Sequence, residues 1–67
     1  MNHYHARLRL SAYRPAKSDG MAVFLMREAA DYHRLVMSLK AFGIAPEITE
    51  GKMLFIVKVD WQDWQSI

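Results

Sequence analysis

Apolar or small residues alternate strictly with polar residues along positions 3–13, close to the start of the chain. A period of two is typical of a strand that buries one of its faces. The sequence therefore predicts a strand at 3–13. A loop at 14–20 is expected to follow, closing with the turn-forming pair Asp19-Gly20.

Residues 21–26 form the longest unbroken apolar run of the chain. They suit a second strand, which the Val23-Phe24 pair and the preceding turn favour. They also suit the first turns of a helix capped by Ser18 or Asp19. The first interpretation predicts an N-terminal hairpin, and the second lengthens the helix that follows.

Residues 27–42 predict an amphipathic helix, because their large apolar side chains fall within an arc of about 120° when successive residues are turned by about 100°. These side chains are Tyr32, Leu35, Val36, Leu39 and Phe42. Gly43 is expected to end the helix in a left-handed conformation, with Ile44 folding back onto it and Pro46 preventing its continuation.

Residues 46–49 and 52–61 predict two further strands joined by a tight turn, and 62–67 a short polar tail. The chain 1–67 is then one small two-layer domain of the α+β class. One amphipathic helix packs on one face of an antiparallel sheet of three to four strands. The element order is ββαββ, or βαββ if 21–26 joins the helix.

This layout leaves apolar side chains that nothing covers. One helix shelters one face of a sheet, whereas the strands at 21–26 and 52–61 are apolar on both faces. A second copy, another partner or the Trp-containing tail would have to cover the other face. We therefore predict an apolar binding surface at Leu54, Ile56 and Trp64. The other interpretation of Trp64 is that it packs against its own chain and ties down the tail.

Charge is distributed unevenly, although its sum is only +2. Residues 1–17 contain four basic residues and no acid, and the remainder contains five basic and seven acidic residues. On the predicted first strand Arg7 and Arg9 project together, with Tyr13, Arg14 and Lys17 nearby, an arrangement that can hold phosphates and stack bases. The alternative is an ordinary solvated face.

Several classes of protein and site are not expected. The chain has no cysteine, so disulfides and thiolate zinc sites are excluded, which fits a reducing cytoplasm. Its apolar runs are too short to span a bilayer, and its first residues do not resemble a signal peptide, so we expect a cytoplasmic protein without a membrane partner.

Candidate chemistry is equally sparse. His3 and His5 could share a metal, but no spacing supplies a third ligand, so we expect neither a metal nor a cofactor. The sequence also shows no recognisable catalytic triad, carboxylate pair or glycine-rich loop. We therefore expect no catalytic residues and no enzyme.

In size and predicted element order the chain resembles small accessory proteins of phages and mobile elements, including some anti-CRISPR proteins and inhibitors of host enzymes. The resemblance transfers no residues. It implies a non-enzymatic interaction protein that self-associates, or that binds and regulates or inhibits a larger protein or nucleoprotein assembly. The alternatives are a nucleic-acid-binding module that uses the basic face, and a small dimeric ligand-sensing domain.

Overall fold

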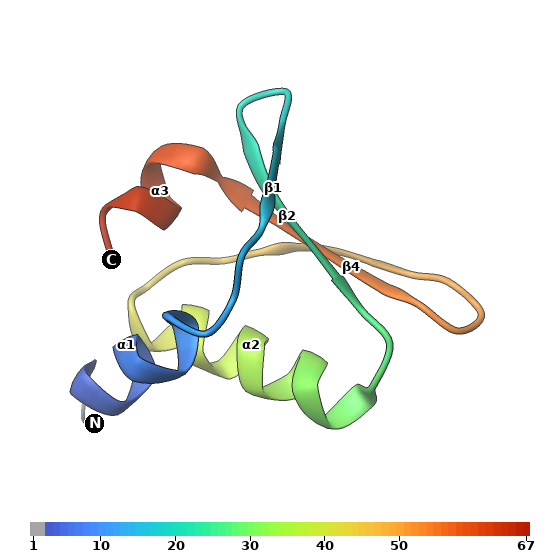
Figure 1. Cartoon of the computed structure of the whole chain (residues 1–67), viewed down its shortest axis with the longest axis horizontal. Coiled ribbons are helices and arrows are strands. Elements are labelled where there is room, and N and C mark those ends of the chain that lie inside the picture. Colours follow the sequence, from blue (N-terminus) through green and yellow to red (C-terminus); the bar gives the residue numbers. More distant parts are fainter. Residues whose placement is uncertain (1–2) are drawn as a thin grey trace.

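The computed structural model describes residues 3–67 and shows a small α+β fold with a four-stranded antiparallel sheet and three helices (Figure 1). Along the chain the elements are α1 (His3–Leu10), β1 (Ala16–Ser18), β2 (Met21–Met26), α2 (Ala29–Ala41), β3 (Glu47–Glu50), β4 (Phe55–Asp60) and α3 (Trp61–Gln65). The predicted class and antiparallel sheet are confirmed. The predicted ββαββ order with a single helix is wrong, because the order is αββαββα.

The sheet has the strand order β1-β2-β4-β3. Its centre is the antiparallel pair of β2 and β4, whose register runs from Met21 opposite Asp60 to Met26 opposite Phe55. Each central strand forms a hairpin with the short edge strand that precedes it. A helix followed by a hairpin therefore occurs twice, as α1-β1-β2 and as α2-β3-β4.

The strand predicted at 3–13 is a helix, α1, over most of that range. A period-two pattern also contains pairs four residues apart, and these fall on one side of a helix. Ala6 and Leu10 form such a pair and are buried, whereas Tyr4 and Leu8 face solvent with 66% and 52% of their surface exposed. Alanine, arginine and leucine all favour helix. Arg7 and Arg9 lie in its last turn, where positive charge opposes the helix dipole.

The first strand of the sheet instead falls inside the predicted loop, at Ala16–Ser18. It turns into β2 through Asp19 and Gly20, whose φ angles are 51° and 74°. Two successive positive φ values define a type I′ turn, whose twist matches that of a hairpin. Strand β2 coincides with residues 21–26, so the strand interpretation of that run is confirmed.

Helix α2 lies within the predicted range 27–42 and ends as expected. The amide of Ile44 donates to the carbonyl of Leu39 at 3.1 Å, and that of Gly43 to Lys40 at 2.9 Å. With Gly43 at φ 74°, these two bonds form a Schellman motif, which satisfies carbonyls left open at the helix end.

The core lies between α2 and the inner face of the sheet. Leu35 and Leu39 of α2 are fully buried, and they belong to one cluster with Phe24 of β2 and Val57 of β4. At the start of α2, the ring of Tyr32 stacks on Phe55, with centroids 4.3 Å apart and planes inclined by 9°. This face of the sheet and α2 together therefore supply most of the buried apolar side chains.

The polar tail predicted at 62–67 is mostly helical. Asp60 caps α3, since its carboxylate accepts a hydrogen bond of 2.8 Å from the amide of Gln62. The helix turns the ring of Trp64 onto Phe24, edge to face, with the centroids 5.1 Å apart. Helix α3 therefore belongs to the same layer as α2.

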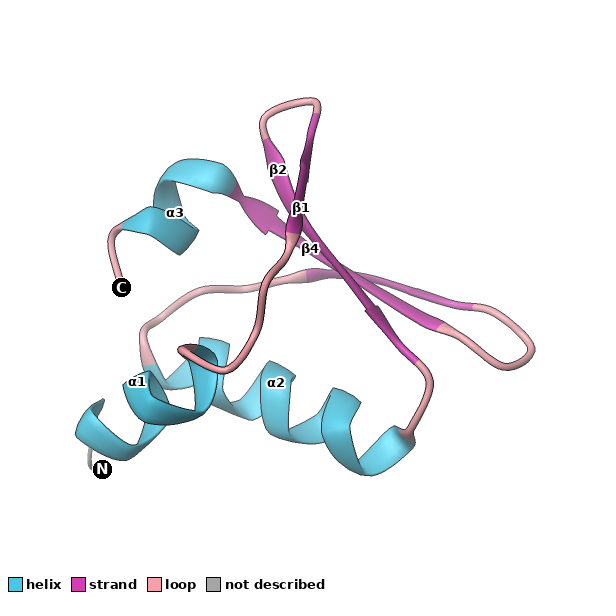
Figure 2. Cartoon of the chain, viewed as in Figure 1, coloured by secondary structure: helices cyan, strands magenta, loops and turns pink. Residues whose placement is uncertain are grey.

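All three helices lie on one side of the sheet, and the opposite side carries none of the described elements (Figure 2). Helix α2 and helix α3 contact both β2 and β4, and α1 packs alongside α2. The single-helix prediction undercounted the helices. The expectation that one sheet face stays uncovered nevertheless agrees with this arrangement.

Candidate docking surface

The uncovered side of the sheet, here called the outward face, follows directly from the strand register. Phe24 lies in the core, so the residues on either side of it in β2 point the other way. Cross-strand partners share a face, and the pairing then assigns the remaining positions. The outward face consists of Ala16, Ser18, Met21, Val23, Leu25, Glu47, Thr49, Ile56, Lys58 and Asp60.

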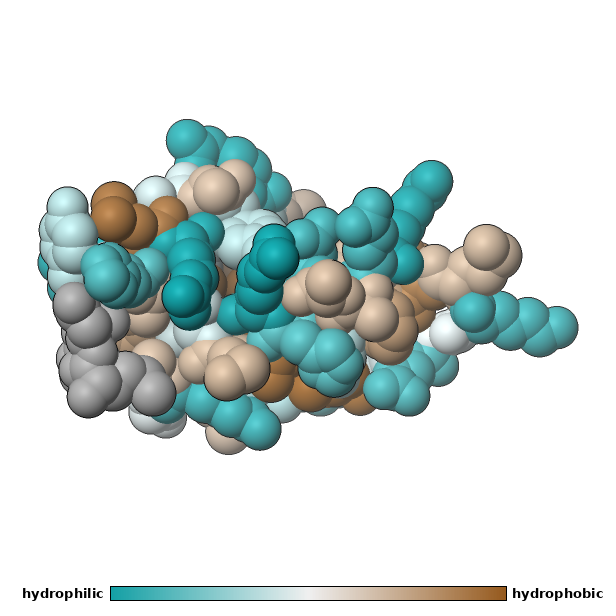
Figure 3. Space-filling model, turned by 90° about the horizontal axis from the view of Figure 1, so that it is seen from below, coloured by the Kyte–Doolittle hydropathy of each residue, from teal (hydrophilic) through white to brown (hydrophobic). Residues whose placement is uncertain are grey.

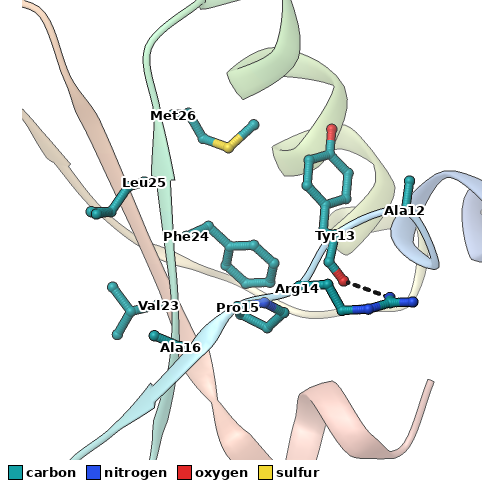
Figure 4. A pocket seen from close by; sticks show the side chains of 9 residues that line it. All are labelled: Ala12, Tyr13, Arg14, Pro15, Ala16, Val23, Phe24, Leu25 and Met26. Carbon is teal, nitrogen blue, oxygen red and sulfur yellow. Dashed lines mark hydrogen bonds between the residues drawn. The ribbon is translucent and has the colours of Figure 1, made fainter.

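An apolar stripe runs along this face. It is formed by Met21, Val23 and Leu25 of β2, together with Ile56, the cross-strand partner of Leu25. Leu25 leaves 64% of its surface exposed, and the other three are partly exposed. Figure 4 shows Val23 and Leu25 on one side of β2, with Phe24 and Met26 on the other. Adjacent exposed apolar side chains on a rigid sheet suit contact with another protein surface.

Charges border the stripe on one side only. Lys58 of β4 is the cross-strand partner of Val23, and Glu47 of β3 is the cross-strand partner of Lys58. Neither Lys58 nor Glu47 makes an ion pair with another described residue. Asp60 lies on the same face two residues beyond Lys58. The outward face is thus apolar along β2 and at Ile56 of β4, and its charges are Lys58 and Asp60 of β4 and Glu47 of β3.

The helical side of the molecule has a different surface. Seen from the side of α1 and α2, it is mainly hydrophilic, with hydrophobic side chains scattered between the polar ones (Figure 3). Met37 of α2, for example, is 67% exposed but lies on this solvated side. It is therefore a matched comparison for Leu25, equally exposed but outside the stripe.

The three predicted apolar binding residues lie in three different places. Ile56 belongs to the stripe, as expected. Leu54 precedes β4 and lies in the turn, where its carbonyl accepts a 2.7 Å hydrogen bond from the amide of Gly51. Trp64 packs against the core, as the second interpretation of this residue had it. The structure does not bring these three residues together.

The stripe residues of β2 were missing from the predicted site, although their signal is in the sequence. The run 21–26 is apolar at every position, which marks both of its faces as apolar once it is known to be a strand. That assignment was open from sequence alone, since the same run also suits a helix.

The predicted basic face does not form. On helix α1, Arg7 and Arg9 are about 200° apart, so they project from opposite sides. Arg14 turns back and donates to the carbonyl of Ser11 at 2.9 Å. Lys17 lies over the ring of Trp61, with its Nζ 5.3 Å from the centroid. The positive charges near the N-terminus are therefore dispersed.

Tyr13, the aromatic member of that predicted face, is instead part of the packing. Its ring contacts Phe24 edge to face, with centroids 6.1 Å apart. Burial raises the pKa of the Tyr13 phenol above its usual value, Asp31 raises it further, and Arg34 opposes the shift. Tyr13 therefore supports the structure between β2 and α2 and does not offer its face to a base.

Two hollows open beside the sheet. The first, of about 360 Å³, lies between β2 and residues 12–16, where β1 is too short to pair with the end of β2 (Figure 4). The second, of about 670 Å³, is bounded by Arg27, Ala29 and the turn 52–55, which includes Leu54. Both are open and mainly apolar, and both lie near the end of the central strand pair where Met26 is opposite Phe55.

Among the side chains that the structure describes, those of residues 4–67, no group of three His, Asp or Glu residues could hold a metal ion. The side chain of His3 lies outside the described part of the structure, so the His3–His5 pair is not defined. No helix in the described chain is long and apolar enough to cross a membrane.

Comparisons with family models, with curated proteins and with solved structures find no match to this chain. Its function has to be inferred from its own residues, and the outward face is the surface with the clearest physical character.

Proposed function

We propose that this chain is a small, non-enzymatic interaction protein that docks on another protein surface through the outward face of its sheet. The observation that carries the proposal is the 64% exposure of Leu25 within the apolar stripe, on the side of the sheet that no described helix covers. Each large apolar side chain transferred from water to an interface contributes about 1.5–3 kcal/mol. The stripe is therefore a source of binding energy.

The architecture supports this role in a second way. Stripe residues lie on the two central strands of the sheet. Met21 and Val23 have strand partners on both sides, and Leu25 is paired with Ile56 of β4, so their positions are held before any partner arrives. A surface that is already ordered loses little conformational entropy on binding. Lys58 and Glu47 flank the stripe and form no ion pair with another described residue, so they can fix the orientation of a partner without contributing much affinity.

A position-specific cross-linking experiment in cells tests the proposal. A photoreactive phenylalanine analogue replaces Leu25 in one variant and Met37 in a second, at nearly equal exposure. We expect discrete protein adducts from position 25 and only background from position 37. Equal labelling from both positions, or none from position 25, would show that the outward face is not the docking surface.

A further inference from the structure

We infer that a partner protein attaches to this chain by adding an extended segment of its own backbone as a further strand, beside residues 24–26 of β2. This mode of attachment rests on the proposed function and deepens it, because it states how the partner docked on the outward face is held. Three features carry it: the hydrogen-bond pattern of the sheet, the lack of protection along this edge, and the hollow beside it.

Strand β2 has a partner along its whole length on one side only. On the side of β4, every residue from Met21 to Met26 is paired. On the side of β1, pairing ends at Ala16 opposite Val23. Residues 24–26 therefore form an open strand edge inside the sheet, about 10 Å long at about 3.3 Å for each residue.

The register shows which backbone groups point to this open edge. The amide of Trp61 donates to the carbonyl of Gly20 at 2.9 Å, so this pair is a hydrogen-bonded position one step beyond the end of β2. Such positions recur at every second residue of an antiparallel pair, so Phe24 and Met26 bond to β4. Leu25 then directs its N–H and C=O to the side of β1. Among the described residues, none makes a backbone hydrogen bond to Leu25 from that side.

The hairpin of β1 and β2 gives the same alternation. A two-residue turn closes on a hydrogen-bonded pair, which here is Ser18 and Met21. Val23 is the next residue of β2 that bonds to β1, and Leu25 is the one after it. Strand β1 begins only after Pro15, so it has no residue opposite Leu25. A strand supplied by a partner would fill this position and satisfy both backbone groups of Leu25.

The outer edges of the sheet are protected, whereas this edge is not. Short strands and charged side chains commonly shield a sheet edge from pairing with another chain. Strand β1 has three residues and carries Lys17, and β3 has four and carries Glu47 and Glu50. Residues 24–26 carry no charge. This part of β2 is therefore the edge that favours an added strand.

The hollow beside residues 24–26 supplies room and apolar walls. It measures about 360 Å³ and lies between β2 and residues 12–16. Figure 4 shows Tyr13 and Phe24 on one side of β2, and Leu25 on the other. Arg14, which is exposed, alone carries a charge among the described residues that line the hollow. The hollow therefore suits uncharged side chains, with an acidic group accommodated only beside Arg14.

The chemistry of the partner segment follows from these features. Its residue opposite Leu25 would share the outward face and extend the apolar stripe. The residues before and after it would point to the core side, where Phe24 and Met26 lie. We expect three consecutive uncharged residues, rich in valine, isoleucine or threonine, which favour strands. In strand addition, main-chain hydrogen bonds give affinity and the side chains give specificity.

Amide hydrogen exchange of the free chain, followed by NMR in dilute solution, tests whether the edge is open. We expect the Leu25 amide to exchange at least about 100-fold faster than the amides of Phe24 and Met26, which bond to β4. Val23 is the internal control, because it also points outward but has a partner in β1, and its amide should exchange more slowly than that of Leu25. A Leu25 amide as protected as that of Phe24 would overturn the open edge.

A peptide selection tests the added strand. The probe is a library of random heptapeptides displayed on phage and selected against the purified full chain. A selected peptide, made synthetically, should slow exchange of the Leu25 amide. The control is Ile48: the amide of Gly51 bonds to the carbonyl of Leu54, so by the same alternation the Ile48 amide points away from β4 on the outer edge. Exchange of the Ile48 amide should not change.

N-methylation of the selected peptide, one residue at a time, distinguishes an added strand from a peptide that only covers the apolar stripe. The methyl group removes a backbone donor and leaves the side chain in place. We expect affinity to fall at least about 10-fold at the residue whose N–H bonds to the Leu25 carbonyl, and to change little at its two neighbours. Equal losses at all three residues, or a selection that yields no peptide protecting Leu25, would overturn strand addition.

The cross-linking experiment judges the proposed function separately. Adducts from position 25, combined with selected peptides that leave the Leu25 amide unprotected, would refute the added strand and leave docking through the outward side chains intact. Protection of Leu25 by a selected peptide, combined with no adducts from position 25 in cells, would instead refute the docking role of the outward face.

Discussion

Replacing Trp64 with alanine tests whether α3 is part of the fold or a detached tail. The ring lies edge-on against Phe24, which is 3% exposed, with the two centroids 5.1 Å apart. Removing a fully buried tryptophan costs about 3–5 kcal/mol. Trp64 keeps part of its surface exposed, so we expect the free energy of unfolding to fall by about 2–3 kcal/mol, of which about 1 kcal/mol comes from the aromatic pair.

This loss is large for so small a domain, whose total stability is expected to be about 3–10 kcal/mol. Urea unfolding followed by far-ultraviolet circular dichroism measures it without relying on tryptophan fluorescence, which the substitution itself alters. With a denaturant slope of about 1 kcal/mol per molar urea, the midpoint should fall by about 2–3 M. Met37→Ala, at a solvated position of α2, should shift it by less than about 0.5 M.

A double-mutant cycle separates the contact from the simple loss of volume. Phe24→Leu and Trp64→Ala, alone and together, should show a coupling energy of about 0.5–1.5 kcal/mol. An unchanged midpoint in Trp64→Ala would refute the packing of α3 described above. Trp64 would then be free to contact a partner, as the first sequence interpretation supposed.

Three further substitutions probe the fold. Ser38 is 2% exposed, and its hydroxyl has no hydrogen-bond partner within the described chain. Ser38→Ala should therefore raise the free energy of unfolding by up to about 1 kcal/mol, and a lower melting temperature of the variant would contradict this. Gly20→Ala should lower the free energy of unfolding, measured in urea, by about 1 kcal/mol. An added Cβ would meet no other atom, but the φ of 74° at Gly20 disfavours any side chain. Asp19→Asn is the neutral control, because asparagine also suits this turn position. The raised pKa of Tyr13 means that the unfolded state loses its phenolic proton first. The contribution of Tyr13 to the free energy of unfolding is therefore full below about pH 10 and declines as the pH rises further. Tyr13→Phe should flatten that decline, and an identical pH dependence of stability in the variant would contradict the raised pKa.

Elements whose pattern admits one explanation could be predicted from sequence. Helix α2 has a continuous stripe ended by Gly43, and both its existence and its Schellman ending were evident. The apolar run 21–26 was compatible with a strand or with the start of a helix, and the turn before it favoured the strand, which is correct. Local rules suffice where periodicity and end signals agree.

The N-terminal segment shows where such rules fail. Its strict alternation fits a strand along the whole segment, whereas the helix that forms buries only Ala6 and Leu10. The helix forms because that pair packs beside α2, a contact between distant parts of the chain that no local pattern reports. The predicted basic face depended entirely on the strand, so it failed with it.

The candidate surface was predicted in kind but not in its residues. An excess of apolar sheet was evident, since two strands are apolar on both faces. Which residues make the uncovered face depends on strand pairing, and the pairing of Leu25 with Ile56 is set by the tertiary fold. Leu54 was misplaced because β4 begins at Phe55, so residues 52–54 of the predicted strand belong to the turn.

The pairing of β2 with β4 also has a consequence for how the chain folds. Both hairpins close locally, and such structures form within about 1–10 µs. The central pair joins residues 29 to 39 positions apart and cannot form until α2 has brought the two hairpins together. We expect the rate-limiting step to be this meeting, with Phe24 and Val57 ordered in the transition state and the outward side chains indifferent to it. The residues available for recognition would then be free to vary without slowing the folding of the molecule.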